Sequence, residues 1–136
     1  MSYSLSAAVQ KGIYDALVQD PAVSGLVGVN VFDSVPSGSL PDLYVVLGQE
    51  KVRDRSDQTG HGANHDLTIS VVTSRPGFSA AKSAAGAVCD RLLGPVPILD
   101  RGRIVNTSFL TARTRREGQG ARRIVDLIFR IRVSDE

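Results

Sequence analysis

The hydrophobic pattern at the start of the chain has a helical period. Apolar residues recur at helical spacing through residues 4–19: Leu5, Ala8, Val9, Ile13, Ala16 and Leu17. Asp20-Pro21 ends this segment, because the residue before a proline avoids helical geometry. Pro21–Val27 is expected to add one further turn. The pattern therefore predicts an amphipathic N-terminal helix with one apolar face.

A strand period dominates the rest of the chain, interrupted by a second helix. That helix spans Phe78–Leu93 and is ended by Gly94-Pro95. Polar segments rich in glycine, proline or serine, at 33–42 and 54–63, separate the strands. The predicted strands are Val29–Phe32, Leu43–Arg53, Asn64–Thr73, Ile104–Ala112 and Arg123–Val133. The order α–β–β–β–α–β–β predicts an α+β fold, a mainly antiparallel sheet covered by two helices.

The final strand has one apolar and one charged face. Successive side chains of a strand point to opposite sides of the sheet, so alternate residues share a face. The apolar face carries Val125, Leu127, Phe129, Ile131 and Val133. The other face carries Asp126, Arg130 and Arg132 beside Ile124 and Ile128. We expect the first face to lie against the core.

The segment between the last two strands is strongly basic and is predicted to be a loop over residues 113–123. Its five arginines and one glutamate give a net charge of +4, and its candidate contact residues are Arg113, Arg115, Arg116, Arg122 and Arg123. One interpretation is a solvated hairpin tip that keeps an exposed strand pair soluble. The other is a flexible basic loop that meets an acidic protein surface or a polyanion. Aromatic residues are absent from the loop, so a nucleic acid would be contacted through its phosphates. Charges on such a loop are expected to contribute little to stability.

Composition narrows the class of protein. A chain of 136 residues with 42% apolar residues predicts a single domain, residues 1–136, with its own core. The net charge of +2 is small for a protein that binds duplex DNA mainly through phosphates. The lone Cys89 cannot form an internal disulfide. Neither a leader nor a membrane-spanning apolar run is seen, which favours a soluble cytoplasmic protein.

Catalytic and metal-binding patterns are weak. His61 and His65 are four residues apart near Asp57 and Asp66, but the neighbouring glycines argue against a helix that would bring them together. We expect solvated loop residues there, with His65 on the strand face opposite Asp66. Cys89 follows the apolar stripe of the second helix and is expected to be a core residue. No nucleophile elbow, phosphate-binding loop or paired carboxylates are present, so neither an enzyme nor a cofactor is expected.

Several segments, in this order and spacing, resemble one protein family. They are Asp20–Gly28, Val31-Phe32, Leu40–Gly48, Asp66–Thr73, the alanine-rich helix from Ala80 to Leu93, and Asp126–Val133. Together they are similar to the small tail-completion, or tail-terminator, proteins of long-tailed bacteriophages and gene transfer agents. Fewer aromatic residues and a more arginine-rich final loop distinguish this chain from the family pattern.

The resemblance implies a structural role without covalent chemistry. It implies a hexameric ring of identical subunits at the head-proximal end of the tail tube, which stops tube growth and docks to the head connector. Its partners would be its own copies, the tail tube protein, the head–tail connector or stopper, and DNA passing non-specifically through the ring, with no membrane. The protein would be assembled in the bacterial cytoplasm and reside in the neck of the particle tail.

Three other classes remain open. The first is another neck or tube protein of the same particle, such as a head–tail stopper or the tube subunit. The second is a free-standing nucleic-acid-binding module, which would lose DNA affinity steeply with salt. The third is a small hydrolase or metalloprotein, which would depend on His61 or His65.

Overall fold

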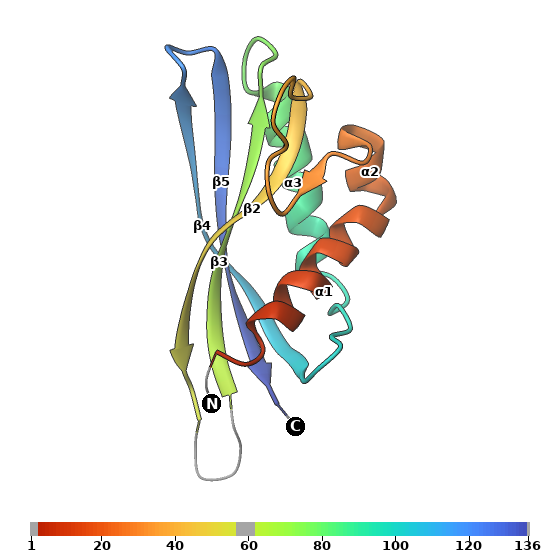
Figure 1. Ribbon diagram of the computed structural model, residues 1–136, viewed down its shortest axis with the longest axis vertical. Coiled ribbons are helices and arrows are strands. Elements are labelled where there is room, and N and C mark those ends of the chain that lie inside the picture. The colour runs from red at the N-terminus through yellow and green to blue at the C-terminus, as the bar shows by residue number, and fades with distance from the viewer. Residues whose placement is uncertain (1–2, 57–61, 136) are drawn as a thin grey trace.

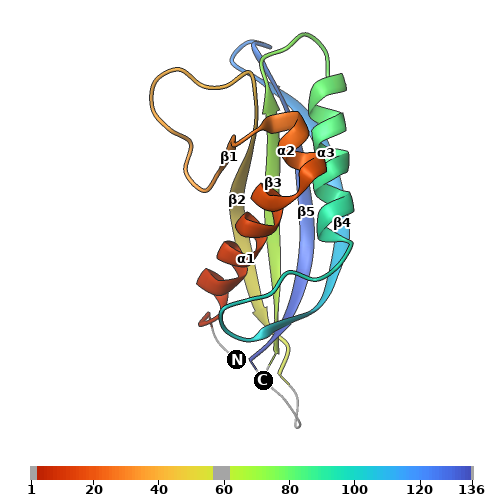
Figure 2. The same ribbon diagram turned by 90° about the vertical axis from the view of Figure 1, so that its right-hand side faces the viewer.

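Three helices cover one face of a five-stranded sheet in the computed structural model, which describes residues 3–56 and 62–135. The helices are α1 (Ser6–Gln19), α2 (Pro21–Val27) and α3 (Ser79–Leu92). They all lie on the same side of the sheet, as Figures 1 and 2 show from two directions. The turn expected after Asp20 is thus a separate short helix. The Asp20 carboxylate caps it, accepting a hydrogen bond from the Val23 N–H at 3.0 Å.

The sheet confirms the α+β prediction. The order of its strands in space differs from their order in the sequence. Its strands are β1 (Val31–Phe32), β2 (Leu43–Asp54), β3 (Gly62–Thr73), β4 (Arg103–Glu117) and β5 (Arg122–Ser134). They lie in the order β1-β2-β3-β5-β4, with β1 parallel to β2 and all other pairs antiparallel. The last strand of the sequence therefore lies inside the sheet between β3 and β4, and β4 forms an outer edge (Figure 1).

The core lies between the helices and the sheet. All five residues of the predicted apolar face of β5 are buried, and Phe129 is fully enclosed. A smaller apolar cluster lies on the opposite, helix-free face, built on Tyr44, Val72 and Ile124. It occupies the end of the sheet near β1, and polar side chains take up much of the rest of that face.

The predicted loop at 113–123 is wrong in its extent. β4 continues to Glu117 and β5 starts at Arg122, so only residues 118–121 connect the two strands. Gly118, Gln119 and Gly120 take positive φ in this turn. The ladder continues through the basic segment because strand pairing uses backbone groups, and the arginines extend sideways from it.

Among the described residues, no helix is long and apolar enough to cross a membrane.

Candidate functional site

The five candidate arginines lie on two different faces of the β4–β5 hairpin. Arg113 pairs with Asp126, and Arg115 pairs with Ile124, so both side chains lie on the helix-free face. Arg122 pairs with Glu117 on that same face. Arg116 pairs with Arg123. Arg123 shares its face of β5 with the buried Val125, so Arg116 and Arg123 lie on the helix side of the sheet. Strand alternation thus divides the predicted basic cluster into three arginines on one side and two on the other.

Arg115 is held by a nearly buried carboxylate. Its Nε donates to Oδ2 of Asp126 at 2.6 Å, and the Ser70 hydroxyl donates to Oδ1 of the same carboxylate at 2.6 Å. Arg115 also bonds to Glu117, and Arg113 lies 3.6 Å from Asp126. Burial disfavours the ionised form of Asp126, but the hydrogen bonds from Arg115 and Ser70 outweigh burial and lower the pKa of this carboxyl. Arg115 is therefore not a freely solvated loop residue, and we expect it to contribute more to stability than the other loop charges.

The two helix-side arginines have different surroundings. The guanidinium of Arg123 lies 5.9 Å from the centre of the Phe78 ring and donates from Nη1 to the Arg75 carbonyl oxygen at 3.4 Å. Arg116 is exposed directly opposite Arg123. The two arginines concentrate positive charge at the tip of the hairpin, and like charges directly opposite each other repel.

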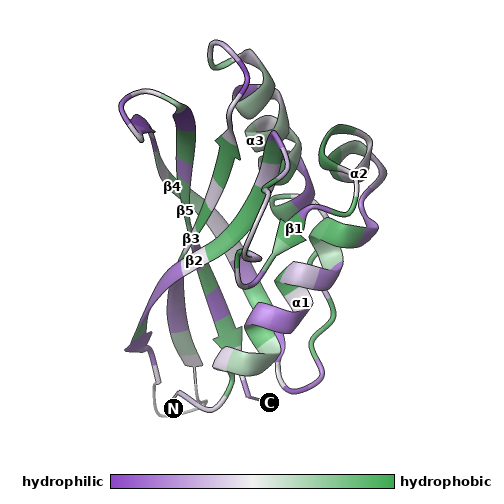
Figure 3. Cartoon of the chain, turned by 45° about the horizontal axis from the view of Figure 1, so that its top comes forward, coloured by the Kyte–Doolittle hydropathy of each residue, from purple (hydrophilic) through white to green (hydrophobic). Residues whose placement is uncertain are grey.

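The helix-free face carries more cations than those of the hairpin tip. The register places eight basic side chains on this face of β2 to β5: Lys51, Arg53, Arg103, Arg113, Arg115, Arg122, Arg130 and Arg132. Only three carboxylates share it, from Asp66, Glu117 and Asp126, which leaves a net charge of +5. The whole chain has only +2, so positive charge is concentrated here. Figure 3 shows the hydrophilic residues along β2 and at the hairpin tip.

Ion pairs organise the middle of this face. Arg130 of β5 binds Asp66 of β3 through two hydrogen bonds, of 2.9 and 3.0 Å. The hydrogen bonds from Arg130 hold the pKa of Asp66 below its usual range despite partial burial. Periodicity had placed Arg130 and Arg132 on a charged face. The sequence did not predict that Lys51, Arg53 and Arg103 belong to the same charged face, because this depends on which strands are neighbours in the sheet.

His65 is buried and does not belong to a solvated loop as expected. It lies on the helix side of β3, with Nδ1 3.3 Å from Oε2 of Glu50, while Asp66 points to the other face as predicted. Burial opposes ionisation of Glu50, but hydrogen bonds from Ser6, Tyr3 and His65 lower the pKa of its carboxyl. His61 and Asp57 lie outside the described residues. Within residues 3–56 and 62–135, no group of three or more ligating side chains could hold a metal ion.

Cys89 is half-buried on α3 beside the core. Burial, and to a lesser degree Asp90, raises the pKa of its thiol. A thiol that remains protonated is a poor nucleophile, in keeping with a packing role.

A comparison with protein families gives a match over most of the chain. The family described as "Tail completion protein gp17" matches residues 11–134. The chain belongs to this family. It is also similar to a solved chain of the "Virion of native gene transfer agent (GTA) particle", with 47% sequence identity and a TM-score of 0.92. The match covers 98% of this chain and 99% of the other. A comparison with curated proteins gave no match.

This tail-completion protein is therefore a structural component of a virion or gene transfer agent particle and resides in its tail. The family is one of structural proteins, and its place in a particle tail implies association with other tail or head proteins. Both findings agree with the resemblance drawn from the sequence.

Proposed function

We propose that this tail-completion protein forms a ring, a hexamer of identical 1–136 domains, at the head-proximal end of a tail tube. The ring stops further addition of tube subunits and offers its other face to the head–tail connector or stopper. The observation that carries this proposal is the near-complete match, at 47% identity, to a chain of a gene transfer agent particle. The family match over residues 11–134 supports it independently.

A terminator must have two different ends. One face of the ring has to match the open end of the tube, and the opposite face must not reproduce that end, or growth would continue. The two ends of this sheet are built from different segments of the chain. The tip of the β4–β5 hairpin carries Arg116, Arg122 and Arg123, whereas the opposite end holds both chain termini (Figure 1).

We further propose that the helix-free face of the sheet is directed towards DNA in the centre of the ring. Arg113, Arg115 and Arg122 belong to that face, whose net charge of +5 matches the phosphate backbone without reading its sequence. Arg116 and Arg123, on the helix side of the hairpin, are then placed to meet an acidic surface of the neighbouring ring.

Native mass and electron microscopy test the ring. We expect light scattering of the protein alone at rising concentration to give a mass of about six times 14.5 kDa. Micrographs of its mixture with tube protein should show rings at one end of each tube. A chain that polymerises into long tubes by itself would instead be a tube subunit. A chain that stays monomeric and never binds tubes would contradict the proposal.

A further inference from the structure

The exposed edge strand β4 has two chemically different halves. From Ile104 to Ala112 the strand contains no charged residue, proline or glycine, whereas Arg113–Glu117 is almost entirely charged. The uncharged half exposes apolar side chains, with Val105, Phe109 and Leu110 all between 41% and 45% exposed. Natural sheets usually protect a long edge with charges, proline or a covering segment. Only the second half of β4 has such protection.

The opposite edge of the sheet is also half covered. β1 pairs with β2 only at Val45 and Val46. Among the described residues, no strand pairs with that side of β2 from Leu47 to Arg53. The backbone groups along this side of β2 are therefore available to another strand.

The uncovered parts of the two edges lie at the same height in the sheet. Following the register across β3 and β5, Leu47 of β2 is level with Ala112 of β4, Glu50 with Phe109, and Arg53 with Asn106. By the same route, the covered Val45 is level with Thr114, in the charged half of β4. The free part of β2 is thus level with the uncharged part of β4 from Asn106 to Ala112.

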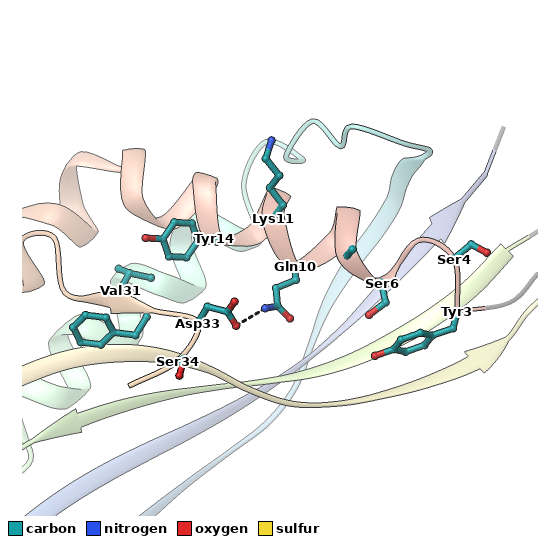
Figure 4. Close-up of a pocket in the computed structure, with 11 residues that line it drawn as sticks. Tyr3, Ser4, Ser6, Gln10, Lys11, Tyr14, Val31, Asp33 and Ser34 are labelled. Atoms are coloured by element: carbon teal, nitrogen blue, oxygen red, sulfur yellow. Dashed lines mark hydrogen bonds between the residues drawn. The ribbon is translucent and has the colours of Figure 1, made fainter. Parts of the chain in front are cut away.

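A groove lies between α1 and the segment from Val31 to Ser34. Figure 4 shows Gln10 and Tyr14 of α1 facing Val31 and Asp33, with β2 passing beneath. Its wall near Tyr3 is fixed by the hydrogen bond of 2.7 Å from the Tyr3 hydroxyl to Glu50. Glu50 is the residue level with Phe109, whose ring faces the helix side of the sheet and packs edge-on against Phe129.

Strand directions determine how two copies can meet. β2 and β4 run in opposite directions within one sheet, since both β3 and β5 lie between them in antiparallel pairs. A rotation about an axis along the strands therefore brings β4 of one copy antiparallel to β2 of the next. The two edges are different surfaces, so the contact is head-to-tail and can close into a ring.

We propose that residues 106–112 of β4 pair with residues 47–53 of β2 in a neighbouring copy, forming one continuous sheet around the ring. In this arrangement Phe109 enters the groove between α1 and β1 of the neighbour, where its exposed ring is buried. This inference rests on the proposed ring and identifies the contact that closes it.

Disulfide cross-linking tests the contact directly. In a Cys89→Ala background, Ser108→Cys is combined in turn with Lys51→Cys and with Arg53→Cys. Ser108 and Lys51 are level in the sheet, and Arg53 allows a shift of two residues on the same face. We expect oxidation of assembled protein to give a ladder of covalent oligomers for at least one pair. Ile98→Cys with Lys51→Cys is the matched control and should give none, because the fully exposed Ile98 lies in the loop after α3.

A charge variant provides a second test. Leu110→Glu should leave the isolated chain folded and weaken self-association at least tenfold, because strand pairing would bury the new carboxylate. Ile98→Glu, the same change at another exposed apolar residue, should assemble normally.

The outcomes separate this contact from the ring itself. Rings that form without any Ser108 cross-link, or that tolerate Leu110→Glu, would overturn the strand pairing and leave the ring intact. Cross-linked open chains that never close would support the pairing and contradict the ring. Protein that shows no association, even with tubes, would overturn both.

Discussion

Arg115 and Asp126 form an ion pair across the β4–β5 ladder, with Nε of Arg115 2.6 Å from Oδ2 of Asp126. The carboxylate is only 8% exposed and receives a second hydrogen bond from Ser70 of β3. Three adjacent strands are thereby connected through one side chain. The composition of this segment suggests a flexible loop, but the pair stabilises it as ordered sheet.

Removal of Arg115 should reduce stability, and removal of Arg116 should not. Arg115→Ala leaves the Asp126 carboxylate nearly buried with fewer partners, which we expect to cost roughly 1–3 kcal/mol of unfolding free energy. Arg116→Ala removes an exposed charge opposite Arg123 and should stay within about 0.5 kcal/mol of the parent. Urea denaturation of the two variants checks this. Equal stabilities would mean that the pair contributes nothing to the fold.

Asp126 should make stability depend on pH in the acid range. Its pKa in the folded chain is lowered below the ordinary value of 3.8. Its stabilising contribution is therefore fully present above about pH 5 and is lost as the pH falls through the folded-state value. We expect Asp126→Asn to be less stable than the parent at pH 7 and to lose less further stability between pH 5 and pH 3. Chemical denaturation at the three pH values measures the difference, and parallel losses would argue against this role.

Phe129 should be the most sensitive aromatic position of the sheet. It is completely buried, so Phe129→Ala creates a cavity and should cost roughly 3–5 kcal/mol. Phe109→Ala is the matched control, because its ring contacts Phe129 but is 44% exposed. It should cost the isolated chain much less and instead reduce assembly. Thermal unfolding separates the two, and a Phe129→Ala variant as stable as Phe109→Ala would contradict the position of the core.

The helix-free face should govern salt-dependent DNA binding by the assembled protein. Arg113→Gln with Arg132→Gln removes two charges from this face, and both residues lie outside the segments proposed to pair between subunits. We expect the slope of log affinity against log salt to fall in magnitude by about 1–2.

The double variant Lys82→Gln with Arg116→Gln removes the same charge from the other side of the molecule and should leave that slope unchanged. Binding isotherms at several salt concentrations make the comparison. If both double variants changed the slope equally, the helix-free face would have no special relation to DNA.

Much of this protein is determined by local sequence. Helix and strand periods predicted the order of the elements, and alternation in the last strand predicted which of its residues enter the core. Both patterns arise within a few neighbouring residues, because a side chain's direction depends on the backbone beside it. The order and spacing of these segments also sufficed to suggest the family to which the chain belongs.

Tertiary structure alone decided which distant residues share a surface. The position of β5 between β3 and β4 brings Asp126 next to Ser70 and gives Lys51, Arg53 and Arg103 a common face with the hairpin arginines. The same order buries His65 beside Glu50 and sets the free half of β2 level with the uncharged half of β4. Strand order and register depend on how the whole core packs, and no short stretch of sequence contains that information.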